Sequence, residues 1–176
     1  MTIIENTLRD DELAYASLDL NKKEGTKTMQ KTSVPNMIGS VSYAAKKVIE
    51  LMSDDMKWGG HFVFLSAMSS VISDTRIYGS GGVADFEQAQ RFEKSAREKA
   101  ERLRAHPEHR SSWQSGPGGA IRCNDRTILS FDGFSGPGDE AVVLLTAVDL
   151  NLLTSGEARE IAQLSDNRIF ATSQKA

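Results

Sequence analysis

Apolar residues recur at helical spacing in the segment that begins near Ser33. They are Met37, Val41, Ala44, Val48 and Leu51. Steps of three and four residues place them on one face, so the spacing predicts an amphipathic helix that ends near residues 53–55. Pro35 is compatible with this prediction because a helix tolerates proline in its first turn.

Residues 61–68 follow the turn at Trp58-Gly59-Gly60 and are rich in aromatic and β-branched side chains. Such a segment, apolar on both faces, is typical of a strand inside a sheet that is covered by helices. Residues 71–78 predict a second extended segment, although Asp74 and Arg76 weaken its apolar pattern.

Residues 85–104 carry the clearest helical pattern of the chain. The apolar stripe consists of Phe86, Ala89, Phe92, Ala96, Ala100 and Leu103. Glutamates precede arginines by four residues at 87/91, 93/97 and 98/102, a spacing that favours ion pairs along an exposed face. We therefore interpret the charged residues of this helix as a solvated face and not as a binding patch.

The C-terminal half predicts a hairpin followed by helices. Residues 120–123 and 127–131 flank Asn124-Asp125-Arg126, and we expect Asn and Asp to supply the positive φ of the turn. A helix follows the glycine-rich residues 133–138, and residues 154–157 have a capping-box pattern that opens a short helix ending near Leu164. The order of elements predicts an α+β fold in which helices pack on one sheet.

Residues 1–33 are polar and show no sustained apolar period, whereas the patterned segments fill residues 34–176. This contrast predicts a flexible tail or oligomerisation arm ahead of one domain. In one hypothesis the chain is a structural homo-oligomer whose arm holds its neighbour.

The 176 residues suffice for one domain, and 21 basic against 24 acidic residues give a net charge of −3. No basic stripe is present, which argues against nucleic acid as a partner.

The single cysteine, Cys123, cannot form an internal disulfide. Residues 141–148 are the longest apolar run and are too short to cross a membrane, and the first residues lack the pattern of a secretory signal. We expect a cytoplasmic protein without membrane contact.

Three histidines are available for chemistry. His61 lies at the entrance of a predicted strand, where a structural role and a pocket role remain equally open. His106 and His109 are separated by Pro107, which prevents a rigid helical pair. We interpret these two as surface histidines and predict no metal site.

Asp132 ends an apolar strand, so its carboxylate must be hydrogen-bonded, be paired or face a cavity, unless the position is an edge open to water. Ser135 follows on a sharp turn, but the surrounding residues do not complete the Gly-x-Ser-x-Gly motif of a nucleophilic serine. The loop at residues 133–138 resembles a phosphate-binding turn. Asp139 and Glu140 would repel phosphate there, so we expect no nucleotide site.

These motifs, taken in order, resemble the GlcG/HbpS family, also described as haem-degrading or PduO C-terminal-like domains. The matching pieces are Gly59-Gly60-His61-Phe62-Val63, Gly118-Gly119-Ala120-Ile121-Arg122, Gly133-Phe134-Ser135-Gly136 and Asp139-Glu140-Ala141. The resemblance implies a profilin-like fold with an antiparallel sheet, frequent homo-oligomers, and haem- or corrinoid-related roles in some members. His61 is the histidine that lies on a matching motif.

Two further functional hypotheses follow. In the first, the chain is a small-molecule-binding domain of this type, with haem as a possible cofactor, and its pocket lies near His61, Ser135, Gly136 and Asp139. In the alternative, a small enzyme uses the same cleft for acid–base chemistry on a small metabolite, with His61, His106, His109 and Asp132 as the catalytic candidates. Both require the glycine turns before His61 and Asp139 to border one cavity.

Overall fold

The computed structural model describes residues 34–52, 58–66, 71–78 and 86–175. The predicted tail at residues 1–33 lies outside the described residues. The elements are α1 (Val34–Met52), β1 (Trp58–Leu65), β2 (Val71–Tyr78), α2 (Phe86–Ala105), a short 3-10 turn (Ser112–Gln114), β3 (Ala120–Arg122), β4 (Ile128–Asp132), α3 (Gly136–Asp149), α4 (Ser155–Leu164) and α5 (Arg168–Ser173).

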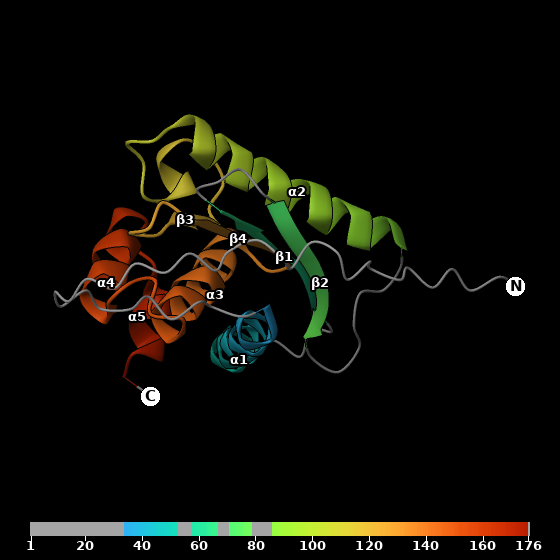
Figure 1. Ribbon diagram of the computed structural model, residues 1–176. Coiled ribbons are helices and arrows are strands. Elements are labelled where there is room, and N and C mark those ends of the chain that lie inside the picture. The colour runs from blue at the N-terminus through green and yellow to red at the C-terminus, as the bar shows by residue number, and fades with distance from the viewer. Residues whose placement is uncertain (1–33, 53–57, 67–70, 79–85, 176) are drawn as a thin grey trace, which may run out of the picture. The chain divides into compact units, whose positions relative to one another are not determined.

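The four strands form one antiparallel sheet in the order β2-β1-β4-β3, so β1 and β4 occupy its centre (Figure 1). In the β1–β4 pair, His61 is opposite Asp132 and Leu65 is opposite Ile128. This register brings the first residues of β1 next to the loop after β4. The two segments are about 70 residues apart in the chain.

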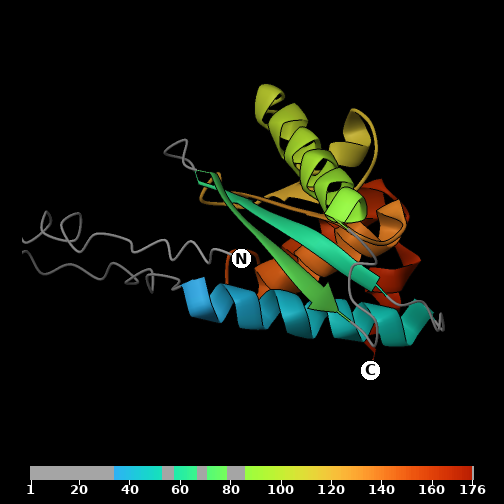
Figure 2. The ribbon, with the colours of Figure 1, turned by 90° about the vertical axis from the view of Figure 1, so that its right-hand side faces the viewer.

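Helices cover both faces of the sheet, as Figures 1 and 2 show. Helix α2 packs on one face, where Val63 and Leu65 of β1 meet Ala96, Ala100 and Leu103. The opposite face packs against α1 and α3. The residues of β1 and β4 that belong to this larger core are Phe62, Leu129 and Phe131, with Phe64 packed against it. The alternation confirms the prediction of a central strand that is apolar on both faces.

The α+β class predicted from the pattern is confirmed, and the first helix buries the predicted face of Met37, Val41, Ala44 and Val48. The stripe predicted for α2 holds only in part, because Phe86 is 75% exposed in the first turn. The buried part of α2 begins at Ala96.

The hairpin forms as predicted, but its positive φ of 68° falls on Arg126. Asp125 instead uses its carboxylate to accept hydrogen bonds from the backbone N–H and the hydroxyl of Thr127. The capping box at Thr154 and Glu157 is confirmed. Helix α5, which begins after the Asn167 cap, had no counterpart among the predicted elements.

We expect Gly119→Ala to lower the free energy of unfolding by roughly 1–3 kcal/mol. Gly119 has a φ of +112°, and an added Cβ would lie 2.7 Å from both the Phe131 carbonyl oxygen and the Asp139 Cβ. Chemical unfolding followed by circular dichroism measures the change. The matched control is Gly39→Ala in α1, where a new Cβ meets nothing within 4 Å. There we expect a gain of up to about 1 kcal/mol; equal effects of the two substitutions would contradict the interpretation.

Candidate functional site

The ammonium group of Lys99 is the centre of a buried ion cluster on the α2 side of the sheet. Its Nζ lies 2.5 Å from Asp132 Oδ1, 2.7 Å from Asp139 Oδ2 and 3.1 Å from the carbonyl oxygen of Phe131. Lys99 is 4% exposed. The prediction that the charged residues of α2 form a solvated face is therefore wrong at this position.

Asp132 is the cluster member nearest to solvent, with its side chain 18% exposed. Its Oδ1 accepts a hydrogen bond from Ser95 Oγ at 2.7 Å in addition to the one from Lys99. Of the alternatives raised for this acid, the structure shows the paired and hydrogen-bonded one. Asp132 thereby joins the end of β4 to the middle of α2.

Asp139 lies in the first turn of α3, is 1% exposed and holds the preceding loop. Its Oδ1 accepts hydrogen bonds from the backbone N–H groups of Gly133, at 3.1 Å, and Phe134, at 2.8 Å. A protein carboxylate therefore already occupies these two amides of the loop. They are not directed toward a bound anion.

The cluster places two carboxylates around one ammonium group, so full ionisation would leave an excess negative charge inside the protein. Burial raises the pKa of Asp139 to about 8, against the opposing influence of Lys99, and the nearby charge of Asp132 adds to the rise. A proton on Asp139 balances the cluster. The carboxyl group therefore titrates near neutral pH.

Both functional hypotheses require the glycine segments before His61 and before Asp139 to be adjacent. His61 is opposite Asp132 in the sheet, and directly opposed residues share a face with their Cβ atoms about 5 Å apart. Gly59 and Gly60, predicted as a turn, belong instead to β1, and the pairing brings the first residues of this strand close to the loop that follows Asp132. His61 itself is only 2% exposed.

Side chains fill the space around these turns. A Cβ added at Gly60 would lie 2.2 Å from the Phe131 ring, and one added at Gly136 would lie 3.0 Å from the Trp113 ring. Gly119 is similarly closed by Asp139 and Lys99. These three glycines therefore allow close packing of the Phe131 ring, the Trp113 ring and the Lys99 side chain.

The remaining candidates are distributed over the surface. Ser135 caps α3, is exposed and makes no capping hydrogen bond with its side chain. His106 and His109 follow α2, which ends at Ala105. Ser95, the residue of α2 that contacts Asp132, lies ten residues or about 15 Å before that end. Of the four catalytic candidates, the structure brings together only His61 and Asp132.

Glu140 is a second buried acid, and its role was not apparent from the sequence. It is fully buried, and its carboxylate accepts hydrogen bonds from Ser111 Oγ at 2.5 Å, from Ser165 Oγ, and from Asn167 Nδ2 at 2.9 Å. Burial raises the pKa of Glu140, and these hydrogen bonds oppose the rise. The network joins α3 to the segment between α4 and α5.

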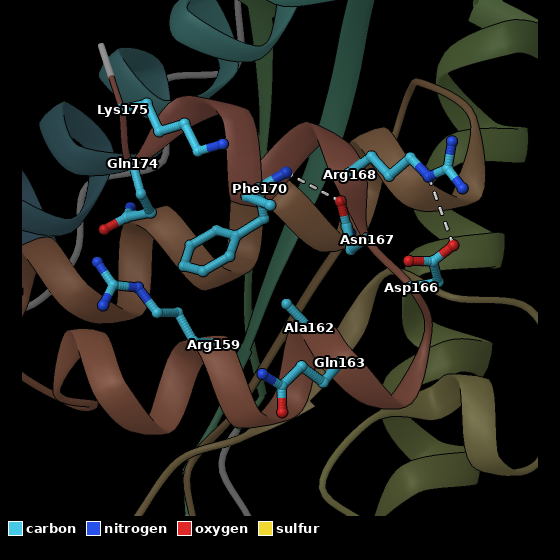
Figure 3. Close-up of a pocket in the computed structure, with 10 residues that line it drawn as sticks. Arg159, Ala162, Gln163, Asp166, Asn167, Arg168, Phe170, Gln174 and Lys175 are labelled. Carbon is cyan, nitrogen blue, oxygen red and sulfur yellow. Dashed lines mark hydrogen bonds and ion pairs between the residues drawn. The ribbon is translucent and has the colours of Figure 1, made fainter.

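A pocket of about 330 Å³ opens between α4 and α5 (Figure 3). Its lining consists of Arg159, Ala162, Gln163, Asp166, Asn167, Arg168, Phe170, Ala171, Gln174 and Lys175. Figure 3 shows Arg159, Gln174 and Lys175 at one end and the Asp166–Arg168 ion pair, 3.5 Å long, at the other. Asn167 connects the pocket to the Glu140 network.

The pocket between α4 and α5 does not fit a haem group. Haem iron in proteins is held by His, Cys, Met or Tyr, and the pocket lining contains none of these. His61, the histidine on the motif of the resembled family, is buried in the sheet and presents no open face to a macrocycle. Cys123 is also buried, which raises the pKa of its thiol.

Comparison of the chain with protein families, with curated proteins and with solved structures finds no match. Among the described residues, no helix is both long and apolar enough to span a bilayer.

We expect Lys99→Met to destabilise the fold by roughly 3–5 kcal/mol, because it leaves Asp132 and Asp139 facing each other without the ammonium group. Chemical denaturation measures this change. Lys94→Met is the matched control on the same helix, since its side chain is 79% exposed, and we expect it to stay within about 0.5 kcal/mol of the wild type. A Lys99→Met effect as small as that of the control would contradict the assignment of the cluster.

We expect the wild-type protein to lose stability between about pH 4, where the carboxyl group of an unfolded chain ionises, and pH 8, where folded Asp139 does. Across this range the folded protein holds a proton that the unfolded chain has released, so the free energy of unfolding falls as pH rises. Asp139→Asn removes this contribution. Unfolding curves at pH 5 and pH 8 should show a smaller loss in the variant, whatever its absolute stability, and equal losses would show that Asp139 is ionised throughout.

Proposed function

We propose that this chain is a small-molecule-binding domain, of the GlcG/HbpS type that its motifs resemble, and that its ligand binds in the pocket between α4 and α5. The observation that carries the proposal is the pocket of about 330 Å³ itself, which lies in the size range of small-metabolite sites. Of the residues expected to form the site, His61 and Asp139 are buried, whereas Ser135 is exposed and Gly136 is half-buried. The proposed ligand site therefore differs from the expected one.

The charges of the pocket indicate an anionic ligand. Arg159 and Lys175 lie at one end without an acid among the residues that line it there, whereas Arg168 at the other end is paired with Asp166. Gln174 lies beside Arg159 and offers an amide donor. A carboxylate, sulfonate or phosphate group would bind at this basic end.

The floor of the pocket indicates that the rest of the ligand is apolar. Phe170 and Ala162 are buried at its base, and Ala171 contributes a further methyl group. The fold fixes this floor, because Asn167 accepts a hydrogen bond from the Phe170 N–H and donates to Glu140. The ligand class is thus a small amphipathic anion with an apolar or aromatic body.

The fluorescent probe anilinonaphthalene sulfonate has this chemistry and tests the proposal directly. We expect one molecule to bind per chain with enhanced fluorescence. Ala171→Trp, at an exposed position on the pocket wall, should fill the space, and Arg159→Glu should reverse the charge at the basic end. Each should weaken binding by roughly tenfold or more, the loss expected when a good ion pair or a whole contact surface is removed.

The matched control is Ala105→Trp, which adds the same side chain at an exposed position at the end of α2. It should leave probe binding unchanged. Binding that does not saturate, or that survives both Ala171→Trp and Arg159→Glu, would locate the probe elsewhere and overturn the proposal.

A second candidate function is acid–base chemistry at the Asp132 end of the ion cluster, beside His61. One observation favours it, namely the partial exposure of Asp132 next to a carboxyl group whose pKa lies near neutrality. Carbon-detected NMR titration of the aspartates tests it. A carboxyl group that titrates near pH 8 supports the hypothesis, whereas ionisation of both below about pH 5 leaves no carboxylic acid to donate a proton at neutral pH.

Two finer features of the proposal are supported by the resemblance and by the sequence. Homo-oligomers are frequent in the resembled family, and Tyr43 on α1 is an exposed aromatic residue at 61%. The single cysteine suits a reducing compartment, so we propose a cytoplasmic homo-oligomer.

A further inference from the structure

Three side chains of the kinds that bind metal ions meet at the turn after α2, apart from both the ion cluster and the pocket. One ligand atom from each of His106, Glu108 and His109 lies within 4.8 Å of the others. Their side chains are 45%, 62% and 19% exposed, respectively. The group is therefore open to solvent on one side.

Backbone hydrogen bonds fix this turn. The His106 N–H donates to the Leu103 carbonyl at 3.2 Å, and the His109 N–H donates to the His106 carbonyl at 3.0 Å. From β3, the guanidinium group of Arg122 donates to the carbonyls of Leu103, His106 and His109. Although the regular helix ends before Pro107, these hydrogen bonds fix the backbone positions of both histidines.

The two distances from the glutamate to the histidines match those between ligands of a tetrahedral metal ion. His106 Nδ1 and His109 Nε2 each lie 3.4 Å from Glu108 Oε1. Metal–ligand bonds of 2.0–2.1 Å in a tetrahedron place neighbouring ligand atoms about 3.3 Å apart. The imidazole rings are stacked with centroids 4.9 Å apart, and one nitrogen of each lies within 4.8 Å of the other.

The environment of the two ring nitrogens of His109 indicates which one would bind a metal ion. Its Nδ1 is buried and has no hydrogen-bond partner among the described residues. Nε2 is therefore the nitrogen that faces Glu108 and solvent.

We propose that His106, Glu108 and His109 form a binding site for a divalent first-row transition ion such as Zn²⁺, with water in the open position. Two imidazoles and one carboxylate are a ligand set that suits such ions and leaves a coordination position free. Arg122 beneath the turn and Arg110 beside it oppose a bound cation. We therefore expect an affinity weaker than that of a closed structural zinc site.

Calorimetric titration of the untagged full-length chain with Zn²⁺, repeated with Co²⁺ to record its visible absorption bands, tests the proposal. We expect one ion per chain. Glu108→Gln, His106→Ala and His109→Ala should each weaken binding by roughly tenfold or more, since even indirect support of a metal ligand contributes that much. The Co²⁺ bands should be lost in both histidine variants.

Glu101→Gln is the matched control, because Glu101 is an exposed glutamate near the end of α2 and pairs with Arg104. It should bind Zn²⁺ as the wild type does. Absence of saturable binding, one ion shared by two chains, or unchanged binding in Glu108→Gln would each overturn the proposal. Because the turn shares no residue with the lining of the α4–α5 pocket, this outcome and that of the anion-binding test are distinguishable.

Discussion

The ammonium group of Lys99 is the interaction on which the arrangement of this fold depends. It joins three elements that are distant in the sequence, because Lys99 belongs to α2, Asp132 to the end of β4 and Asp139 to the first turn of α3. A buried ion pair contributes little net stability when compared with apolar packing, but breaking one is costly. We infer that its consequence here is specificity, since a shift of α2 along its axis would move Lys99 away from both carboxylates.

The same cluster determines the conformation of the loop between β4 and α3. Asp139 accepts two backbone hydrogen bonds from this loop with one carboxylate oxygen and binds Lys99 with the other. The loop looks like an anion-binding turn in sequence because it has the glycines and the following helix of one. The amides of Gly133 and Phe134 are satisfied by Asp139, and the glycines that follow, Gly136 and Gly138, allow close packing against Trp113 and Phe134.

Periodicity predicted most of the elements because each helix and strand has an apolar face of its own to bury. Lys99 shows where that reasoning stops. It lies three residues after Ala96 and four before Leu103, on the buried stripe, and this spacing was the available signal. What could not be read from one sequence is the tertiary register that supplies its partners, since this depends on how β1, β4 and α2 align in space. The same limit applies to His61, because strand pairing places it opposite Asp132 and only packing determines its burial.

The distribution of polarity explains why the sites proposed here lie away from the centre of the sheet. Lys99, Asp139 and Glu140 have their hydrogen-bonding capacity engaged by protein groups, so their chemistry is directed inward. A ligand must instead be bound by groups that can still donate or accept hydrogen bonds or coordinate an ion. Arg159 and Lys175 at the α4–α5 pocket meet this condition, as do the solvent-facing imidazoles at the turn after α2. Both places are linked to the rigid centre, the first through Asn167 and Glu140 and the second through Arg122, so a preorganised core holds the surface groups in position.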